Sequence, residues 1–348
     1  MENMVKIMKV LVLGIDGYIG TRLAQTLIKR GHDIVGVDTG FYREGWLYNG
    51  IEQMPRIINK DTRDLTEEDL RGYDAVIHLA DLSNDPLGQQ DPELTYDINH
   101  KASVRVATLA KKVGVRRFIY SSSCSAYGIA TEDFVNEESE LNPQTAYAKC
   151  KVLVENDLKN LADDTFSPTY MRNATVYGPS PRMRFDLVVN NLSGIAHTKG
   201  RIDMTSDGTP WRPLVHIEDV CEAFASVLEA PIEAVHNEVF NVGNNNSNYQ
   251  IKEVAEIVAS VFEGCQISFG NSDGDTRSYR VNFDKINSKL PGYKSTREVK
   301  QGVEDLKKVF ETIKMTEEIF NFRAYTRINE LVHLKETGQI NDKLFFKK

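Results

Sequence analysis

Cysteine is scarce in this sequence, and no motif pairs the few that are present. The four cysteines, Cys124, Cys150, Cys221 and Cys265, form no Cys-x-x-Cys pair in 348 residues, and the seven histidines lack metal-ligand spacing. This pattern favours a reducing compartment and argues against a disulfide framework or a zinc site, so we expect no bound metal.

Long apolar runs are missing as well. No run approaches the roughly 18 residues that a membrane span needs. Residues 10–13 are apolar, but this run is too short for the core of a signal peptide, and no small-residue cleavage site follows it. We therefore expect a cytoplasmic protein that does not contact a membrane.

An excess of positive charge is also absent. Lys and Arg number 42 and Asp and Glu number 50, which gives a formal net charge of −8, and no basic stripe is present. Such a chain is poorly suited to bind the backbone of a nucleic acid. Any anionic ligand has to be held by individual arginines and by backbone N–H groups.

The first half of the sequence alternates between strand and helix patterns. Buried strands are indicated by short apolar runs at residues 10–13, 34–37, 75–79 and 118–121. Between them, residues 21–30 and 91–112 carry the apolar spacing of helices. This alternation predicts an α/β fold with a Rossmann-type doubly wound parallel sheet, covered by helices on both faces.

Glycine and proline interrupt this pattern after about residue 175. We expect residues 1–177 to form the Rossmann domain. Residues 178–300 are expected to form mainly a smaller C-terminal substrate-binding lobe, with a strand at 239–242 returning to the first sheet. Residues 301–348 have helical periodicity and are predicted to be a C-terminal helical extension, to which the sequence assigns no chemistry.

Three regularly spaced glycines follow the first predicted strand. Gly14, Gly17 and Gly20 lie where this strand meets a helix that begins near Tyr18 and Ile19. The first permits a tight turn, the second lets the backbone approach a pyrophosphate, and the third lets the helix pack on the strand. The helix N-terminus then offers unpaired N–H groups to the phosphates.

Asp38 indicates a dinucleotide as the ligand of this loop. It ends the second predicted strand, 18 residues after Gly20, where a carboxylate can bind both hydroxyls of an adenosine ribose. A 2′-phosphate would meet a like charge there, so the sequence favours NAD over NADP. Asp16, inside the glycine loop, is predicted to turn outward or to cap the helix.

A serine, a tyrosine and a lysine form the candidate catalytic group. Tyr147 and Lys151 are four residues apart in a predicted helix over residues 146–158, so both lie on one face. Ser123 ends a predicted parallel strand, at the edge where α/β sheets bind ligands. A phenol has a pKa of about 10, which a cationic lysine and a positive nicotinamide ring lower, so Tyr147 becomes a competent base. Ser123 can donate a hydrogen bond to the same substrate hydroxyl.

With these residues, the chain resembles the extended short-chain dehydrogenase/reductase family, in its nucleotide-sugar epimerase/dehydratase branch. The resemblance runs from residue 9 to residue 286, and the family's motifs stand in order at residues 14–20, 61–64, 76–80, 99, 121–128, 147–151, 176–179 and 212–220. Besides the glycine loop and Asp38, it implies cofactor contacts at Asp61, Thr62, Leu79, Ala80, Asn99, Tyr147 and Lys151. It implies nucleotide-sugar contacts at Asn191, Leu192, Arg212 and Asp275.

Several positions depart from the family pattern. Asp81 replaces a small residue, and Thr175 replaces an asparagine that contacts the sugar in many relatives. Ser272 stands where a phosphate-binding arginine is usual, and Arg277 or Arg280 is the candidate replacement. These differences leave the sugar and the nucleotide base open.

The pair Cys124-Ser125 departs from the pattern of one group of relatives in particular. Sugar-nucleotide 4,6-dehydratases carry an Asp-Glu pair immediately after the catalytic serine or threonine, because elimination needs both a proton donor and a base. Cys124 is kept as a candidate substrate contact, but a neutral thiol is a poor proton donor to a leaving hydroxyl. The pair therefore argues against dehydration.

Two arginines mark the start of the second lobe. Arg182 and Arg184 lie beside a proline-containing turn and are candidates to clamp the substrate diphosphate. The alternative is that both are solvated surface side chains. Similar stretches occur in the C4 dehydrogenases of the family.

The resemblance implies an NAD-dependent epimerase of a nucleotide-diphosphate sugar, acting at C4 through a 4-keto intermediate. One alternative is a C4 dehydrogenase or ketoreductase with net redox chemistry and an exchangeable cofactor. Another is a non-catalytic NAD-binding regulator, against which the presence of all three catalytic residues argues. The family also implies a homodimer formed by the helices at residues 91–112 and 146–158.

Overall fold

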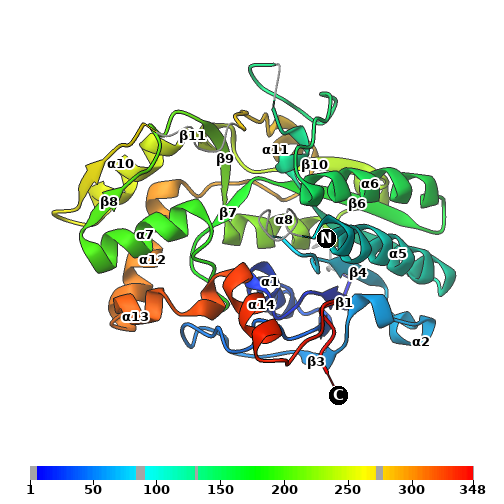
Figure 1. Cartoon of the computed structure of the whole chain (residues 1–348). Coiled ribbons are helices and arrows are strands. Elements are labelled where there is room, and N and C mark those ends of the chain that lie inside the picture. Colours follow the sequence, from blue (N-terminus) through cyan, green and yellow to red (C-terminus); the bar gives the residue numbers. More distant parts are fainter. Residues whose placement is uncertain (1–5, 84–90, 130–131, 272–276, 348) are drawn as a thin grey trace.

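The centre of the molecule is a seven-stranded parallel sheet (Figure 1). The structure, a computed structural model, describes residues 6–83, 91–129, 132–271 and 277–347. In spatial order, the strands are β10 (Glu238–Val242), β6 (Ser167–Asn173), β5 (Arg117–Ser123), β4 (Ala75–His78), β1 (Lys9–Leu13), β2 (Asp33–Asp38) and β3 (Arg56–Asn59). The chain reverses its direction across the sheet between β1 and β4, and such a switch point is where doubly wound sheets bind ligands.

Both faces of this sheet are buried because its strands are apolar on both. Val10 and Val12 of β1 pack in the cluster that includes α1 (Tyr18–Lys29) and α8 (Ile217–Glu229). Leu11 and Leu13 pack in the cluster that includes α5 (Ala102–Lys112) and α6 (Ala146–Leu161). Alternate side chains of a strand point to opposite faces, so the Rossmann-type doubly wound fold is confirmed.

The helix predicted over residues 91–112 consists of three consecutive segments. They are α4 (Pro92–Thr95), the π-helical η2 (Tyr96–Lys101) and α5. The Asp91 carboxylate accepts from the Leu94 amide at 3.0 Å and caps the first segment. Inside η2, the buried Asn99 side chain accepts from the Leu82 amide at 2.8 Å and donates to the Leu82 carbonyl at 3.0 Å. The helix is thereby tied to the loop that follows β4.

A second lobe lies beyond β6. Its strands are β7 (Thr175–Tyr177), β9 (Trp211–His216) and β11 (Asn248–Gln250) in one sheet, with β8 (Arg201–Asp203) and β12 (Gln266–Ser268) in another. Its main helices, α7 (Val188–Lys199), α10 (Ile251–Val261) and α12 (Val299–Thr312), pack on one another. Strand β10, which contains residues 239–242, leaves this lobe and pairs in parallel with β6.

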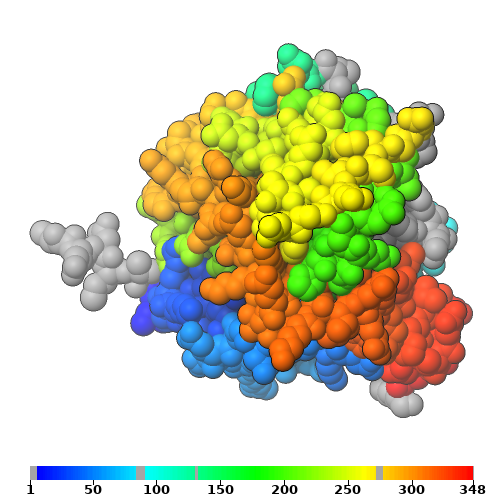
Figure 2. All heavy atoms as spheres, turned by 90° about the vertical axis from the view of Figure 1, so that its left-hand side faces the viewer, coloured from blue at the N-terminus to red at the C-terminus, as the bar shows by residue number. Residues whose placement is uncertain are grey.

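The C-terminal segment runs back from the second lobe to the first. In Figure 2 it lies, orange to red, between the yellow and green second lobe and the blue N-terminal residues. It contains α13 (Glu317–Phe320), η5 (Arg323–Tyr325) and α14 (Arg327–Glu336). The remaining short helical segments are η1 (Thr62–Asp64), α2 (Glu67–Leu70), η3 (Cys124–Tyr127), α9 (Ile232–Val235), η4 (Asn245–Ser247) and α11 (Asp284–Lys289). None of the helices in the described ranges has the length and apolar character to span a bilayer.

Candidate active site

A cavity of about 930 Å³ lies at the carboxyl ends of β1, β4 and β5, where the two lobes meet. Gly14, which follows β1, and Ala80, which follows β4, line it together with Ser123 at the end of β5. Arg212 and Tyr279 line it from the second lobe. A large cleft with a few convergent polar groups is the usual form of a ligand site.

The glycine loop forms one wall of the cavity. Gly14 has φ +82°, and a Cβ there would lie 2.9 Å from the Ala80 nitrogen. A Cβ on Gly20 would lie 2.2 Å from the Gly14 carbonyl oxygen, so the loop requires glycine at both positions. Gly17 is the N-cap of α1, which places the N–H groups of the first helical turn where they can bind phosphate.

Asp16 and Arg182 form a buried ion pair that links the glycine loop to the second lobe. Arg182 Nε and Nη2 each donate to the Asp16 carboxylate at 2.8 Å, and its Nη1 donates to the Tyr42 and Arg43 carbonyls. The expectation that Asp16 turns outward or caps the helix is wrong, because its side chain is 9% exposed and pairs with Arg182. Arg182, predicted to clamp the substrate diphosphate, does not line the cavity.

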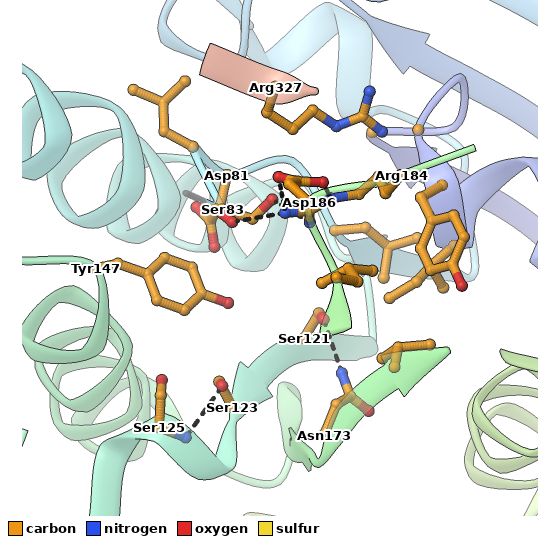
Figure 3. A pocket seen from close by; sticks show the side chains of 18 of the residues that line it. Asp81, Ser83, Ser121, Ser123, Ser125, Tyr147, Asn173, Arg184, Asp186 and Arg327 are labelled. Atoms are coloured by element: carbon orange, nitrogen blue, oxygen red, sulfur yellow. Dashed lines mark hydrogen bonds and ion pairs between the residues drawn. The ribbon is translucent and has the colours of Figure 1, made fainter. Parts of the chain in front are cut away.

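The three predicted catalytic residues meet in the cavity. Figure 3 shows the Tyr147 ring directed into it, with Ser123 nearby. The Lys151 Nζ lies 5.2 Å from the centroid of the Tyr147 ring, and it bonds to the Asp81 carboxylate and the Ser121 carbonyl. Although burial opposes the charge on Lys151, the Asp81 carboxylate raises the pKa of this lysine above its usual value. A cation is therefore held beside the phenol.

The serines at the end of β5 have different partners. Ser121 Oγ accepts from Asn173 Nδ2 at 3.0 Å (Figure 3), and Ser122 Oγ donates to Glu155 Oε1 at 2.5 Å in the interior. Ser123 Oγ lines the cavity and accepts from the Ser125 amide at 3.1 Å. Since a hydroxyl that accepts can still donate its own hydrogen, Ser123 can bind a substrate oxygen.

A buried ion pair that sequence reasoning missed lies next to these residues. Glu155 follows the catalytic tyrosine and lysine at spacings of four along α6, so it lies on the same face. Arg172 Nε and Nη2 donate to the Glu155 carboxylate at 3.0 and 2.7 Å, and Arg172 Nη1 donates to the Tyr127 hydroxyl at 3.0 Å. This pair joins α6 to β6 and fixes the helix that carries the catalytic group.

One family model matches most of the chain. It is the NAD dependent epimerase/dehydratase family, and the match covers residues 10–243. The chain belongs to this family. NAD is its cofactor, and structures of similar proteins have been solved with NAD bound.

Members of the NAD dependent epimerase/dehydratase family that resemble this chain have different named activities. A UDP-glucose 4-epimerase from Lactobacillus helveticus is 29% identical over 279 residues, which are 73% of this chain and 82% of that protein. A UDP-N-acetyl-alpha-D-glucosaminuronate decarboxylase from Bacillus cytotoxicus is 26% identical over 258 residues, covering 71% and 78% of the two chains. Among solved structures, MoeE5 in complex with UDP-glucose and NAD is 26% identical, with a TM-score of 0.75 over 88% of this chain and 100% of MoeE5.

The residues at the end of β2 fit the NAD of this family. The Asp38 carboxylate accepts from the Gly40 amide at 2.8 Å and from the Asp16 amide at 3.0 Å. Burial raises the pKa of Asp38 above its usual value. These bonds fix the carboxylate beside the glycine loop, where it can accept from the hydroxyls of a ribose.

We expect Asp38→Asn to weaken NAD binding by about ten- to a hundred-fold, which is what losing hydrogen bonds to a charged acceptor costs. NADP should lose less, because the charge that repels its 2′-phosphate is removed. Both affinities can be measured by titrating the protein with each cofactor. Asp33→Asn, an exposed position on the same strand, is the matched control, and an equal loss for NAD and NADP would contradict the assignment.

The other family-implied cofactor positions lie at the cavity, with one exception. Those that line it are Gly14, Gly17, Tyr18, Ile19, Gly20, Asp61, Thr62, Leu79, Ala80, Tyr147 and Lys151. Asn99 does not line it: its side chain is 0% exposed and bonds to the Leu82 amide and carbonyl. Asn99 therefore shapes the cofactor wall through Leu82, which does line the cavity.

The predicted substrate contacts divide into two groups. Thr175, Arg184, Arg212 and Arg277 line the cavity. Asn191 and Leu192 do not: the Asn191 amide donates to the Phe185 carbonyl at 2.8 Å, and Leu192 packs in the core. Asp275 and Ser272 lie outside the described residues.

Cys124 is also displaced from the predicted site. Its thiol is 1% exposed and donates to the Arg172 carbonyl at 3.1 Å. Burial raises the pKa of this thiol well above its usual value. The expectation of a substrate contact at Cys124 does not fit the structure, because the turn after Ser123 directs this side chain into the core.

Sequence reasoning named Arg184 but missed its two partners in the cavity wall, Asp186 and Ser83. Arg184 donates to both oxygens of Asp186 at 3.0 and 2.8 Å and to the Ser83 hydroxyl at 2.9 Å (Figure 3). The spacing of Arg184 and Asp186 was a usable signal, since oppositely charged neighbours two apart in a loop can form a chelating pair. Arg327 of α14 also lines the cavity, and no pattern in the neighbouring sequence predicts that it does. Within the ranges that the structure describes, no cluster of His, Cys, Asp and Glu is suited to hold a metal ion.

Proposed function

We propose that this chain is an NAD-dependent epimerase that inverts C4 of a nucleotide-diphosphate sugar. The observation that carries the proposal is which side chains in the cavity are available to act as an acid or a base. Tyr147 is directed into it, whereas each carboxylate among its described lining residues is already bonded to a cation or to backbone N–H groups.

Those carboxylates belong to four residues. Asp81 is paired with Lys151, Asp186 with Arg184, and Asp61 with Arg63, and Asp38 accepts from two backbone amides. Dehydration would need one group to protonate the leaving hydroxyl and another to remove the C5 proton. Redox at C4 needs only one acid–base group, which Tyr147 provides.

The chemistry follows from the positions of the three catalytic residues. Tyr147 takes the proton of the C4 hydroxyl, and Ser123 donates a hydrogen bond to the same oxygen. Lys151 stabilises the phenolate that forms, because its ammonium lies beside the ring. NAD, held by the glycine loop and Asp38, would supply reversible hydride transfer at C4. In an epimerase the 4-keto sugar turns over before C4 is reduced again, and Tyr147 gives back the proton.

The substrate end of the cavity is cationic. Arg212 and Arg277 line it from the second lobe, and guanidinium groups suit the bidentate binding of phosphate oxygens. The similarity to a UDP-glucose 4-epimerase and to MoeE5 bound to UDP-glucose supports a uridine diphosphate sugar as the first substrate to test.

The net reaction can be tested by incubating the purified holoenzyme with UDP-glucose, UDP-galactose and related sugars in deuterium oxide. We expect a C4 epimer of unchanged composition, with no deuterium at C5 and no NADH released. Mass spectrometry and proton NMR of the product measure its composition and its deuterium content, and absorbance measures any NADH released. Loss of water would indicate a dehydratase, loss of carbon dioxide a decarboxylase, and loss of two hydrogens with stoichiometric NADH a C4 dehydrogenase, and each of these results would overturn the proposal.

A further inference from the structure

Arg327, the first residue of α14, brings a positive charge from the C-terminal segment into the cavity. Thr326, Arg327 and Ile328 all line it, although they lie far along the chain from the glycine loop. Arg327 is buried, with 5% of its surface exposed. Figure 3 shows it above the pair formed by Arg184 and Asp186.

The guanidinium of Arg327 has no hydrogen bond and no ion pair with any residue in the described part of the chain. Its face lies 3.8 Å from the centroid of the Tyr42 ring. The two nearby carboxylates are already bonded, Asp186 to Arg184 and Asp38 to two backbone amides. Arg184 adds a like charge to these surroundings.

A buried guanidinium without an anionic partner is costly in any fold. Burial lowers the pKa of Arg327 to about 10, which still leaves it charged at neutral pH. Its five N–H donors form a fork that matches two phosphate oxygens. An anion that enters the cavity would supply the partner that the protein does not.

The segment that carries Arg327 is fixed against the cofactor half of the cavity. Leu331, Leu334, Ile340 and Leu344 pack with Phe41 and Leu82. Arg63 Nη1 donates to the Lys343 carbonyl at 2.8 Å, and its guanidinium lies 3.7 Å from the Phe345 ring. The Phe41 and Phe346 rings stack with centroids 5.6 Å apart. Phe41 and Tyr42 follow Asp38 closely, so the segment covers the ribose end of the NAD site.

We propose that Arg327 binds the diphosphate of NAD, so that the C-terminal segment is part of the cofactor site. Arg327 is assigned to the cofactor diphosphate rather than to the substrate diphosphate because of its position. Its charged neighbours include Asp38, which lies at the ribose end of the NAD site. The substrate end of the cavity already has two arginines from the second lobe, Arg212 and Arg277. The assignment depends only on NAD as cofactor and holds whichever net reaction the enzyme catalyses.

The test compares Arg327→Met and Arg327→Lys with the natural protein, using NAD, ADP, adenosine and UDP as ligands that compete with bound NADH, followed by its fluorescence. In Arg327→Met we expect affinities for NAD and ADP to fall about ten- to a hundred-fold, the effect of losing charge-assisted hydrogen bonds. Adenosine should bind unchanged, because it has no phosphate. Arg327→Lys should fall between the two, since it keeps the charge and loses the fork.

A second measurement separates this role from a merely structural one. The melting temperature of NAD-free Arg327→Met should stay the same or rise, because a buried unpaired charge is removed, while the increase on adding NAD should shrink. Lys335→Met, an exposed position on the same helix, is the matched control and should change neither. An equal loss for adenosine and ADP, a loss for UDP alone, or unchanged affinity for ADP would each overturn the proposal.

Discussion

Tyr147→Phe is expected to lower turnover by roughly 10²–10⁴, the usual contribution of a positioned acid–base group. The phenol hydroxyl is directed into the cavity, and the Lys151 ammonium lies 5.2 Å from its ring. Phenylalanine keeps the ring and removes the one atom that can carry the proton. Two quantities are measured: the steady-state rate with the nucleotide sugar that the deuterium oxide experiment identifies as the substrate, and the amount of NAD that the protein retains.

The bound NAD should be retained, because the substitution keeps the ring and leaves the glycine loop, Asp38 and Lys151 in the cavity wall unchanged. Tyr73→Phe is a matched control, since Tyr73 lies outside the cavity wall and contacts Lys9. Turnover near that of the natural protein would show that another group is the base. A loss of NAD in parallel with the loss of turnover would show that the substitution had damaged the site itself.

Arg172→Met is expected to lower the free energy of unfolding by about 3–5 kcal/mol, because it leaves the Glu155 carboxylate buried without a partner. Glu155 is 0% exposed, and Arg172 is 2% exposed and donates to both of its oxygens. Adding Glu155→Leu to Arg172→Met should recover much of the loss, since both charges are then gone. Urea or thermal unfolding of the two variants measures the difference.

Arg201→Met provides the comparison for an exposed ion pair. Arg201 and Asp203 are 60% and 52% exposed, and substitutions at such sites usually change stability by less than about 0.5 kcal/mol. If Arg172→Met changed stability as little as Arg201→Met, the buried pair would not be holding α6 in place. A double variant less stable than Arg172→Met would also contradict this account.

The fold and the catalytic trio were accessible from sequence because their signals are local. Short apolar runs of four or five residues mark β1, β2, β4 and β5. The glycine spacing indicates a backbone that a Cβ would block at Gly14 and Gly20. Tyr147 and Lys151 share a face because helix geometry alone puts residues four apart on one side. None of these inferences needs knowledge of a distant contact.

The remaining errors concern side chains whose partners are far away in the chain. Asp16 finds Arg182 166 residues later, so nothing near Asp16 signals that it is buried and paired. Cys124 turns inward because of the 3-10 turn that follows β5, a detail that a strand pattern does not contain. Arg327 enters the cavity only because the C-terminal segment folds back across the molecule, and its own helix looks like an ordinary packing helix.

The return of β10 to the edge of the main sheet limits which segments of the gene can be exchanged between related proteins by recombination. The lobe that lines the substrate end is contributed by two separate stretches, one containing β7 to β9 and another containing β11 to α12, with α8 and β10 of the Rossmann sheet encoded between them. An exchange of the whole lobe as one continuous stretch would therefore also replace α8 and β10, and with β10 the native parallel pairing with β6. New substrate preferences in this architecture are expected to arise by point substitutions in the cavity wall, rather than by exchange of a whole lobe as a cassette.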